Sequence, residues 1–153
     1  MEEAIEKYTE GLAVDKENDT IQATLLSNRA TALLRVRDSV FATERSLTLS
    51  SQLKKTTEAL ADCDACLAVA PTYFKALRTR GRIHLSTEDF EAAVRDLKQA
   101  YELAPTGSND EASLSREVKD AEVKLKKSKM KDHYKTLGIT SDASESEIKK
   151  GRS

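Results

Sequence analysis

The sequence predicts an all-α protein made of repeated pairs of helices. The main observation is a pattern that occurs twice at a spacing of 34 residues: Ala59, Asp62 and Pro71 recur as Ala93, Asp96 and Pro105. Charged residues form 33% of the 153-residue chain and aromatic residues only 5%, with 5 Gly and 2 Pro. This composition suits helices with solvated outer faces and argues against a β-sandwich or barrel. One unit of this size cannot bury its own apolar face, so consecutive copies are expected to stack.

Apolar residues at helical spacing define the elements of the array in order. The predicted helices cover residues 2–14, 20–35, 56–69, 72–85 and 88–103. Pro71 and Pro105 follow the third and the fifth of these helices and end them, because proline removes a backbone donor and clashes with the preceding turn. The helix over 2–14 corresponds to the second helix of a unit, so the first helix of that unit is expected to be missing.

The C-terminal third is predicted to hold a long helix and then a short one. Ser108 and Glu111 form a capping box that begins a helix over 109–130. The last unit of a stacked array needs a cap with one polar face, and this helix suits that role. A short helix over 132–137 and a turn at Gly138 follow.

The spacing of 34 residues resembles the period of the tetratricopeptide repeat, a helix–turn–helix unit. Small residues stand where the paired helices of such a unit must approach closely: Gly81, Ala93 and Ala100. The resemblance implies about two and a half repeats over residues 1–106, followed by the capping helix within 107–130. Arrays of this kind typically hold other proteins in a concave groove lined by the first helix of each unit.

Residues 126–150 resemble the opening of a J domain. The matching elements are Asp132, Tyr134, Leu137, Gly138 and the run over 143–150. From residue 76 to residue 150 the chain is similar to the co-chaperones that join tetratricopeptide repeats to a DnaJ-type module. Residues 131–153 are therefore expected to be a truncated J domain.

In that family the J domain stimulates ATP hydrolysis by DnaK-type heat-shock chaperones through a His-Pro-Asp motif after its second helix. Neither His84 nor His133 is followed by Pro-Asp, and the chain ends at Ser153 before the motif would occur. Only Lys149 and Lys150 remain of the basic surface with which the second J helix docks on the chaperone. We therefore expect this chain to leave the chaperone ATPase unstimulated.

Residues 36–52 interrupt the second unit, since their removal joins Arg35 to Leu53 and restores the repeat spacing. This stretch is rich in Ser and Thr, and we expect it to be irregular and partly disordered. Its first and last residues, Val and Gln, can be encoded by codons that match the GT and AG edges of an intron. The hypothesis is a retained intron in a fragment of a larger co-chaperone. The alternative is an ordinary interhelical loop, because long loops cost little entropy.

The first helices of the array carry the candidate binding residues. Lys75, Arg78 and Arg82 are spaced to share one helical face, and Asn28 has a matching inner position on the preceding first helix. Such a face can bind a carboxylate through charge-assisted hydrogen bonds. The resemblance implies a clamp for the acidic C-terminal tails of heat-shock chaperones, with Asn28 and Lys75 at clamp positions. Thr79 replaces the arginine of that clamp, and Arg78 is the candidate substitute. A solvated basic face is the alternative.

Other reactive residue types have structural interpretations. Cys63 and Cys66 fall at packing positions of the repeat, and no second pair of ligands completes a zinc site. His84 takes the place of a large packed side chain, and the Asp and Glu residues are expected on solvated helix surfaces. The lysines between 124 and 131 suit the C-terminal end of a helix dipole. No catalytic group, metal site or cofactor is predicted, and the chain is not expected to be an enzyme.

The net charge of −1 gives no general attraction to nucleic acid, and no signal peptide or long apolar span is visible. We therefore expect a cytoplasmic protein without a nucleic-acid or membrane partner. The predicted function is a co-chaperone scaffold whose groove binds client proteins or heat-shock chaperones of the DnaK type, with the 90-kDa class as a further candidate. Two alternatives stay open, a generic repeat adaptor without a tie to chaperones and a non-functional, mis-spliced fragment.

Overall fold

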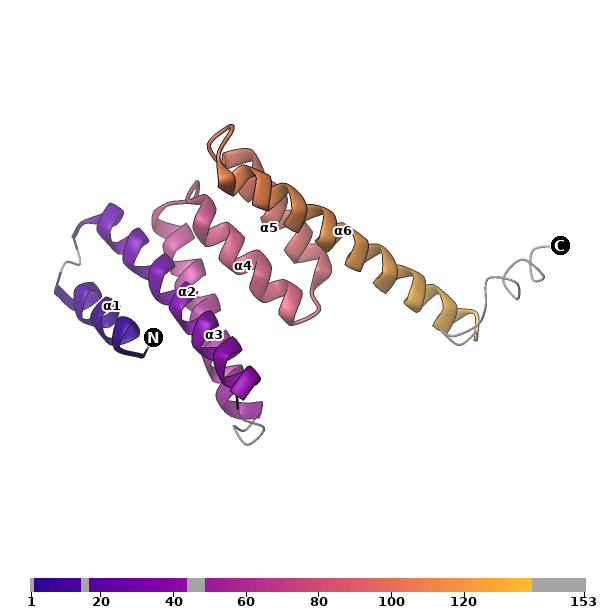
Figure 1. Cartoon of the computed structure of the whole chain (residues 1–153), viewed down its shortest axis with the longest axis horizontal. Coiled ribbons are helices and arrows are strands. Elements are labelled where there is room, and N and C mark those ends of the chain that lie inside the picture. Colours follow the sequence, from indigo (N-terminus) through magenta and orange to yellow (C-terminus); the bar gives the residue numbers. More distant parts are fainter. Residues whose placement is uncertain (1, 15–16, 44–48, 139–153) are drawn as a thin grey trace.

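The computed structural model describes residues 2–14, 17–43 and 49–138. All regular structure within these ranges is helical (Figure 1). The helices are α1 (Glu2–Val14), α2 (Asp19–Thr43), α3 (Leu49–Val69), α4 (Phe74–Ser86), α5 (Phe90–Leu103) and α6 (Asn109–Thr136). The predicted all-α repeat array is therefore confirmed.

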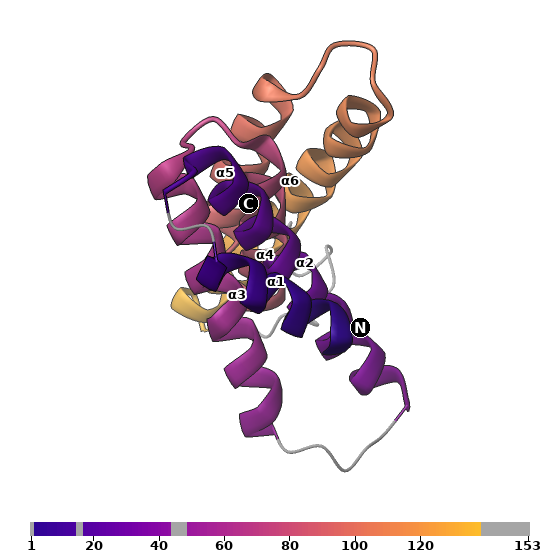
Figure 2. The ribbon, with the colours of Figure 1, turned by 90° about the vertical axis from the view of Figure 1, so that its left-hand side faces the viewer.

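Helices that are adjacent in the chain pack against each other, and α2 also packs against α4. This additional contact stacks the pair α2–α3 beside the pair α4–α5 (Figures 1 and 2). The buried apolar residues in the described part of the chain form three clusters, and α4 contributes to each of them through Ile83, Ala76 and Leu77. The helix that carries most of the predicted binding residues is therefore anchored in the core on its opposite side.

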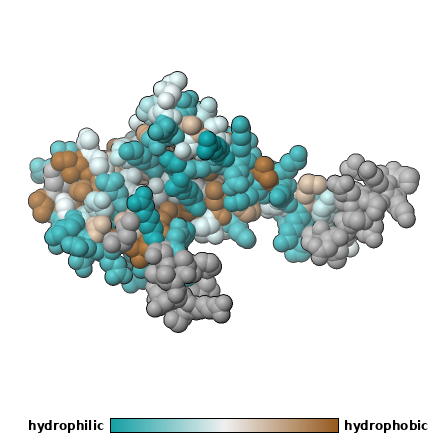
Figure 3. Space-filling view, in the orientation of Figure 1, coloured by the Kyte–Doolittle hydropathy of each residue, from teal (hydrophilic) through white to brown (hydrophobic). Residues whose placement is uncertain are grey.

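The first helix is the least buried part of the array. α1 packs against α2, yet none of its described residues is fully buried. Val14 and Ile21 are exposed, and Figure 3 shows apolar side chains gathered at the end of the molecule formed by α1 and the start of α2. An apolar surface of this kind is what a stacked neighbour would cover.

Gly81 allows α4 and α5 to approach each other closely. A Cβ atom at this position would lie 2.8 Å from Cγ of Leu97, closer than real Cβ contacts occur. Ala93 and Ala100 on α5 are fully buried. The small residues predicted at the helix contacts are therefore confirmed.

Several predicted helix ends are confirmed. α3 and α5 each end two residues before a proline. At the start of α6, Ser108 Oγ accepts a hydrogen bond from the backbone N–H of Glu111 at 3.1 Å, and Glu111 Oε2 accepts one from the N–H of Gly107 at 2.6 Å. Gly138 has φ 70°, a conformation that glycine adopts easily just beyond a helix.

The prediction that residues 36–52 are irregular is wrong for their described part. α2 continues to Thr43 and α3 begins at Leu49, so both helices run beyond the ends expected from the repeat. Val36 is buried, which anchors the start of this extension in the core. Residues 44–48 lie outside the described residues, and the retained-intron hypothesis stays a prediction.

The physical reason for this difference is that no proline or glycine interrupts residues 36–52, so nothing in the covalent structure of the backbone ends either helix there. Arg37 also connects the start of the extension to its neighbours. Its Nη1 donates hydrogen bonds to Thr56 Oγ1 at 3.3 Å and to Ser86 Oγ at 3.0 Å.

The predicted break between a capping helix and a separate short helix is also wrong. α6 runs unbroken from Asn109 to Thr136, because no proline or glycine interrupts this stretch. Leu114 and Ala121 of α6 belong to the core cluster that α5 lines, Val118 and Leu125 pack against it, and the C-terminal end of α6 extends beyond the other helices (Figure 1). The domain boundary at residue 131 and the truncated J domain over 131–153 stay predictions, and residues 139–153 lie outside the described residues.

Candidate functional site

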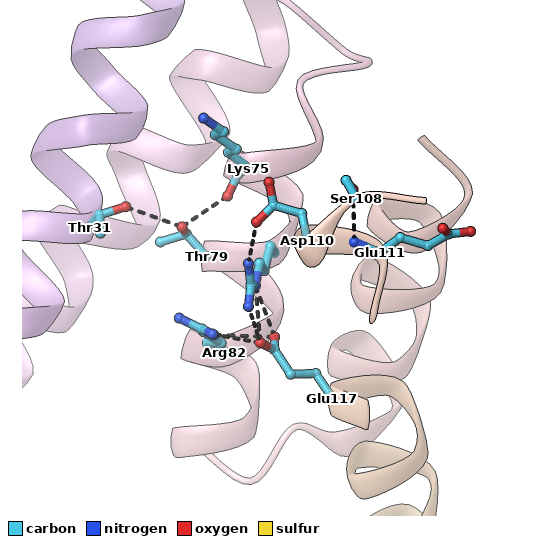
Figure 4. Close-up of polar contacts among 9 residues, drawn as sticks. Thr31, Lys75, Thr79, Arg82, Ser108, Asp110, Glu111 and Glu117 are labelled. Carbon is cyan, nitrogen blue, oxygen red and sulfur yellow. Dashed lines mark hydrogen bonds and ion pairs between the residues drawn. The ribbon is translucent and has the colours of Figure 1, made fainter. Parts of the chain in front are cut away.

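The arginines predicted on one face of α4 contact carboxylates of α6. Arg78 donates from Nε to Glu117 Oε1 at 3.0 Å and from Nη1 to Asp110 Oδ1 at 3.2 Å. Arg82 donates from Nε to Glu117 Oε2 at 3.2 Å. Both arginines also donate from Nη2 to Glu117 Oε1 at 2.5 Å. The carboxylate of Glu117 therefore lies against two guanidinium groups, as Figure 4 shows for Arg82 and Glu117.

Glu117 is largely covered by this contact, with 19% of its side chain exposed. Burial is the largest influence on its carboxyl group and raises the pKa. The hydrogen bonds and charges of Arg78 and Arg82 outweigh burial, so the pKa of Glu117 lies below its ordinary value. Glu117 is therefore ionised at neutral pH and holds α6 against α4.

Sequence reasoning missed the role of Glu117. The available signal was weak, since Asp110 and Glu117 are seven residues apart and thus share one face of α6. Nothing local connects them to α4, because Glu117 lies 39 residues from Arg78. In a chain with this many charged residues each arginine has many possible acidic partners, so the sequence alone does not indicate which one it contacts.

Lys75 and Asn28 are placed differently from the two arginines. Both side chains are exposed, and neither forms a hydrogen bond or ion pair with another side chain in the described ranges. In Figure 4 the amine of Lys75 points away from Glu117. These two predicted residues therefore remain open to an external ligand, while Arg78 and Arg82 already hold an internal one.

Thr79, at the position of the family's clamp arginine, belongs to the contact between α2 and α4. Its side chain is buried, and its hydroxyl donates a hydrogen bond to the backbone carbonyl of Lys75 at 2.9 Å. The hydroxyl also lies 3.4 Å from Oγ1 of Thr31 on α2. A carboxylate ligand would have no charged group to contact at this position.

Two buried aspartates contradict the prediction that all acidic residues are solvated. Asp62 on α3 accepts hydrogen bonds from Nε and Nη2 of Arg29 at 2.7 and 2.6 Å. Asp96 on α5 accepts the same pair of bonds from Arg80 at 2.7 and 2.9 Å. These bonds raise the pKa of both arginines. Each pair ties the first helix of a repeat to the second, because a buried charge requires a charged partner.

The spacing of these two pairs supports the repeat assignment. Arg29 and Asp62 are 33 residues apart, whereas Arg80 and Asp96 are 16 residues apart. The difference of 17 residues equals the length of the stretch 36–52. The same contact therefore occurs in both repeats once the insertion is taken into account.

Cys63 and Cys66 are fully buried, as predicted for packing positions. Burial raises the pKa of Cys63 to about 12 and that of Cys66 to about 11. Cys66 Sγ donates a hydrogen bond to the carbonyl of Ala23 at 3.2 Å. His84 is half-buried, with Nε2 3.6 Å from Asp96. No group of three or more His, Cys, Asp or Glu side chains is placed to hold a metal ion in the ranges that the structure describes.

A second surface feature lies between α5 and the projecting half of α6. This cavity has a volume of about 440 Å³ and is lined by apolar residues, by lysines, and by Glu122 and His133. The main lining residues are Val94, Leu125, Met130, Lys98, Lys126 and Lys129. The lysines predicted on a solvated helix end are exposed. None of the described helices is long and apolar enough to cross a membrane.

Comparison with known proteins identifies the repeat. The tetratricopeptide repeat family matches residues 75–106, which contain most of α4 and all of α5. The matched segment includes three of the four predicted binding residues, Lys75, Arg78 and Arg82.

Almost the whole chain is also similar to longer proteins. Over 149 residues it is 40% identical to the DnaJ homolog subfamily C member 7 homolog of Schizosaccharomyces pombe, covering 97% of this chain and 27% of that protein. Over 147 residues it is 36% identical to the human DnaJ homolog subfamily C member 7, covering 96% of this chain and 25% of that protein.

A third match is the tetratricopeptide repeat and J domain-containing co-chaperone DNJ1 of Fusarium oxysporum. It is 36% identical over 92 residues, which cover 60% of this chain and 17% of that protein. These matches confirm the resemblance predicted from the sequence. The chain spans about a quarter of the length of the first two relatives.

Proposed function

We propose that this chain, a relative of the tetratricopeptide-repeat co-chaperones of the DnaJ type, acts as a scaffold that binds heat-shock chaperones or their client proteins. The proposed binding surface is the face formed by the first helices α2 and α4. Asn28, Lys75, Arg78 and Arg82 are its contact residues. The candidate partners are chaperones of the DnaK type, those of the 90-kDa class, and clients.

The observation that carries this proposal is the unpaired state of Lys75. Its amine has no carboxylate partner among the described residues, although 26 acidic residues are present in the chain. The opposite side of α4 is fixed by core contacts through Leu77 and Ile83. Because α4 is already fixed in the core, most of the conformational entropy lost on binding would be lost by the partner.

The chemistry that this face offers is recognition of carboxylates. The ammonium group of Lys75 can form a charge-assisted hydrogen bond with an external carboxylate. The guanidinium groups of Arg78 and Arg82 form bonds of the same kind, in this structure with Glu117. The amide of Asn28 adds a neutral donor. No step of this binding involves a covalent change, so the proposed role is non-enzymatic and needs no cofactor. The proposed location is cytoplasmic.

The role of the C-terminal segment is a separate proposal. Lys149 and Lys150 would contribute a small part of a basic surface for a DnaK-type chaperone. The 153 residues of this chain contain no His-Pro-Asp motif. We expect single-turnover ATP hydrolysis by such a chaperone to stay at its background rate when this chain is added. A clear stimulation would contradict this part of the proposal.

The binding proposal is tested by titration with a designed peptide. The probe is a heptapeptide of Ala and Ser with one Glu three residues before a free C-terminal carboxylate. Its matched control is the same peptide with a C-terminal amide. We expect the amide to bind about five- to tenfold more weakly, because one charge-assisted contact is lost at a partly exposed site.

Protein variants locate the binding face. Lys75→Gln is expected to weaken binding by a similar factor, whereas Lys54→Gln on α3 removes the same charge elsewhere and should have little effect. Equal affinity for the free-acid and the amidated peptide would favour the generic repeat adaptor. A purified monomer without a cooperative thermal transition would favour the non-functional fragment.

A further inference from the structure

The contact between Glu117 and the two arginines of α4 has the chemistry of the proposed ligand contact. A side-chain carboxylate of this chain occupies Arg78 and Arg82, as an acidic partner would. We propose that these arginines form a second carboxylate site beside Lys75, and that a partner's carboxylate enters it by displacing Glu117. This inference rests on the proposed function, because it assumes that acidic segments bind to this face.

The geometry leaves a route for such an exchange. Arg82 is half-exposed, with 52% of its side chain open to solvent, whereas the side chain of Arg78 is only 20% exposed. Asp110 contacts Arg78 but forms no ion pair with Arg82 in the described part of the chain. An incoming carboxylate would therefore meet Arg82 first and share it with Glu117 before the exchange is complete.

The exchange replaces the hydrogen bonds of Glu117 with equivalent hydrogen bonds to the partner. In the closed state Glu117 accepts hydrogen bonds from both arginines. In the bound state the partner's carboxylate would accept them, and the side chain of Glu117 would turn away from the arginines into solvent. The number of charge-assisted bonds to the arginines is then unchanged. The free energy of binding to the partner is less favourable by the free energy of the contact between Glu117 and the arginines, which must be broken first.

The spacing of the basic groups defines the class of ligand. Lys75 and Arg82 are seven residues apart on α4, which corresponds to about 10 Å along the helix axis. An extended peptide spans about 10 Å in three residues. The site therefore suits an extended segment with two carboxylates three residues apart, one for Lys75 and one for the arginine pair.

Substitution of the internal carboxylate tests the exchange. Glu117→Gln keeps the size of the side chain but removes its charge. We expect this variant to bind the free-acid heptapeptide about three- to tenfold more tightly than the unmodified chain, since a partly exposed ion pair of this strength no longer competes. Asp120→Asn is the matched control, because Asp120 also lies on α6 and, among the described residues, forms its ion pair with Lys124 on the same helix.

A second substitution shows whether the gain comes from the arginines. Arg82→Gln introduced together with Glu117→Gln should remove the gain. Three results would overturn the inference: an unchanged or weaker affinity of Glu117→Gln, an equal gain in Asp120→Asn, or a gain that survives the loss of Arg82. A lower melting temperature of Glu117→Gln without tighter binding would make Glu117 a structural contact only.

The outcomes separate this inference from the proposed function. If neither the unmodified chain nor Glu117→Gln binds the free-acid peptide, both proposals fail. If the unmodified chain binds the peptide through Lys75 and Glu117→Gln binds it equally well, the scaffold proposal stands and the exchange is rejected.

Discussion

Asp96 accepts two parallel hydrogen bonds from Arg80, at 2.7 Å from Nε and 2.9 Å from Nη2, although the side chain of Asp96 is fully buried. The pair connects α4 to α5 within one repeat. Asp62 and Arg29 make the same connection between α3 and α2. The array is therefore fixed by repeated ion pairs as well as by apolar packing.

Loss of the buried charge should destabilise the fold. Asp96→Asn leaves Arg80 without its main partner, and we expect the free energy of unfolding to fall by about 2–4 kcal/mol. Asp64→Asn is the matched control, because Asp64 contacts the same arginine at 3.0 Å from an exposed position. Its expected cost is about 0–1 kcal/mol. Urea unfolding followed by circular dichroism measures both, and equal effects would contradict the structural role of Asp96.

The close contact at Gly81 gives a second prediction. Gly81→Ala places a methyl group against Leu97, and we expect a loss of about 1–3 kcal/mol in the free energy of unfolding from overpacking. Gly11→Ala is the control, since its Cβ would lie 3.1 Å from Cδ1 of Leu25, at the end of a flexible side chain. It should cost less, because better helix propensity offsets the contact. A stabilised Gly81→Ala variant would show that α4 and α5 are less tightly packed.

The repeat array could be predicted from the sequence because its signals are local and periodic. Pro71 and Pro105 end helices by their covalent geometry, and Gly81 marks a close approach by its size. The lengths of α2 and α3 could not be predicted in the same way. Ser and Thr in 36–52 indicated irregular structure, whereas the absence of proline and glycine from this stretch lets both helices continue through its described part.

The candidate site was harder to predict than the fold. The sequence predicted Lys75, Arg78 and Arg82 on one helical face, because that depends only on helical spacing, and all three lie on α4. It could not identify Glu117 as the partner of Arg78 and Arg82, because an ion pair between helices depends on how α6 is positioned. The buried Asp96 had a usable signal in its repetition at Asp62, but charge alone suggested exposure.

Protonation of Glu117 should appear as a pH dependence of stability. Its pKa in the folded chain lies below the ordinary value, so its stabilising contribution is present above the unfolded pKa and is lost as the pH falls through the folded pKa. The unmodified chain should therefore melt at a higher temperature than Glu117→Gln near neutral pH. This difference should shrink below about pH 4, as the carboxyl group is protonated. A difference that is independent of pH would contradict the ion pair with Arg78 and Arg82.

The buried cysteines should be unreactive while the array is folded. Burial raises the pKa of Cys63 to about 12 and that of Cys66 to about 11, so both thiols are protonated at pH 8 and shielded from reagents. We expect labelling by a thiol-reactive disulfide to be slow in native conditions and fast in denaturant. Rapid labelling of the native chain would contradict the packing of α3 against its neighbours.

Chemical-shift perturbation of the isotope-labelled chain maps where the free-acid heptapeptide binds, and so tests the proposed binding face. We predict that the perturbed signals belong to Asn28, Lys75, Arg78, Arg82 and Glu117, and that the amidated peptide perturbs them less at equal concentration. Perturbations confined to the cavity between α5 and α6, at Val94, Leu125 and Met130, would contradict it.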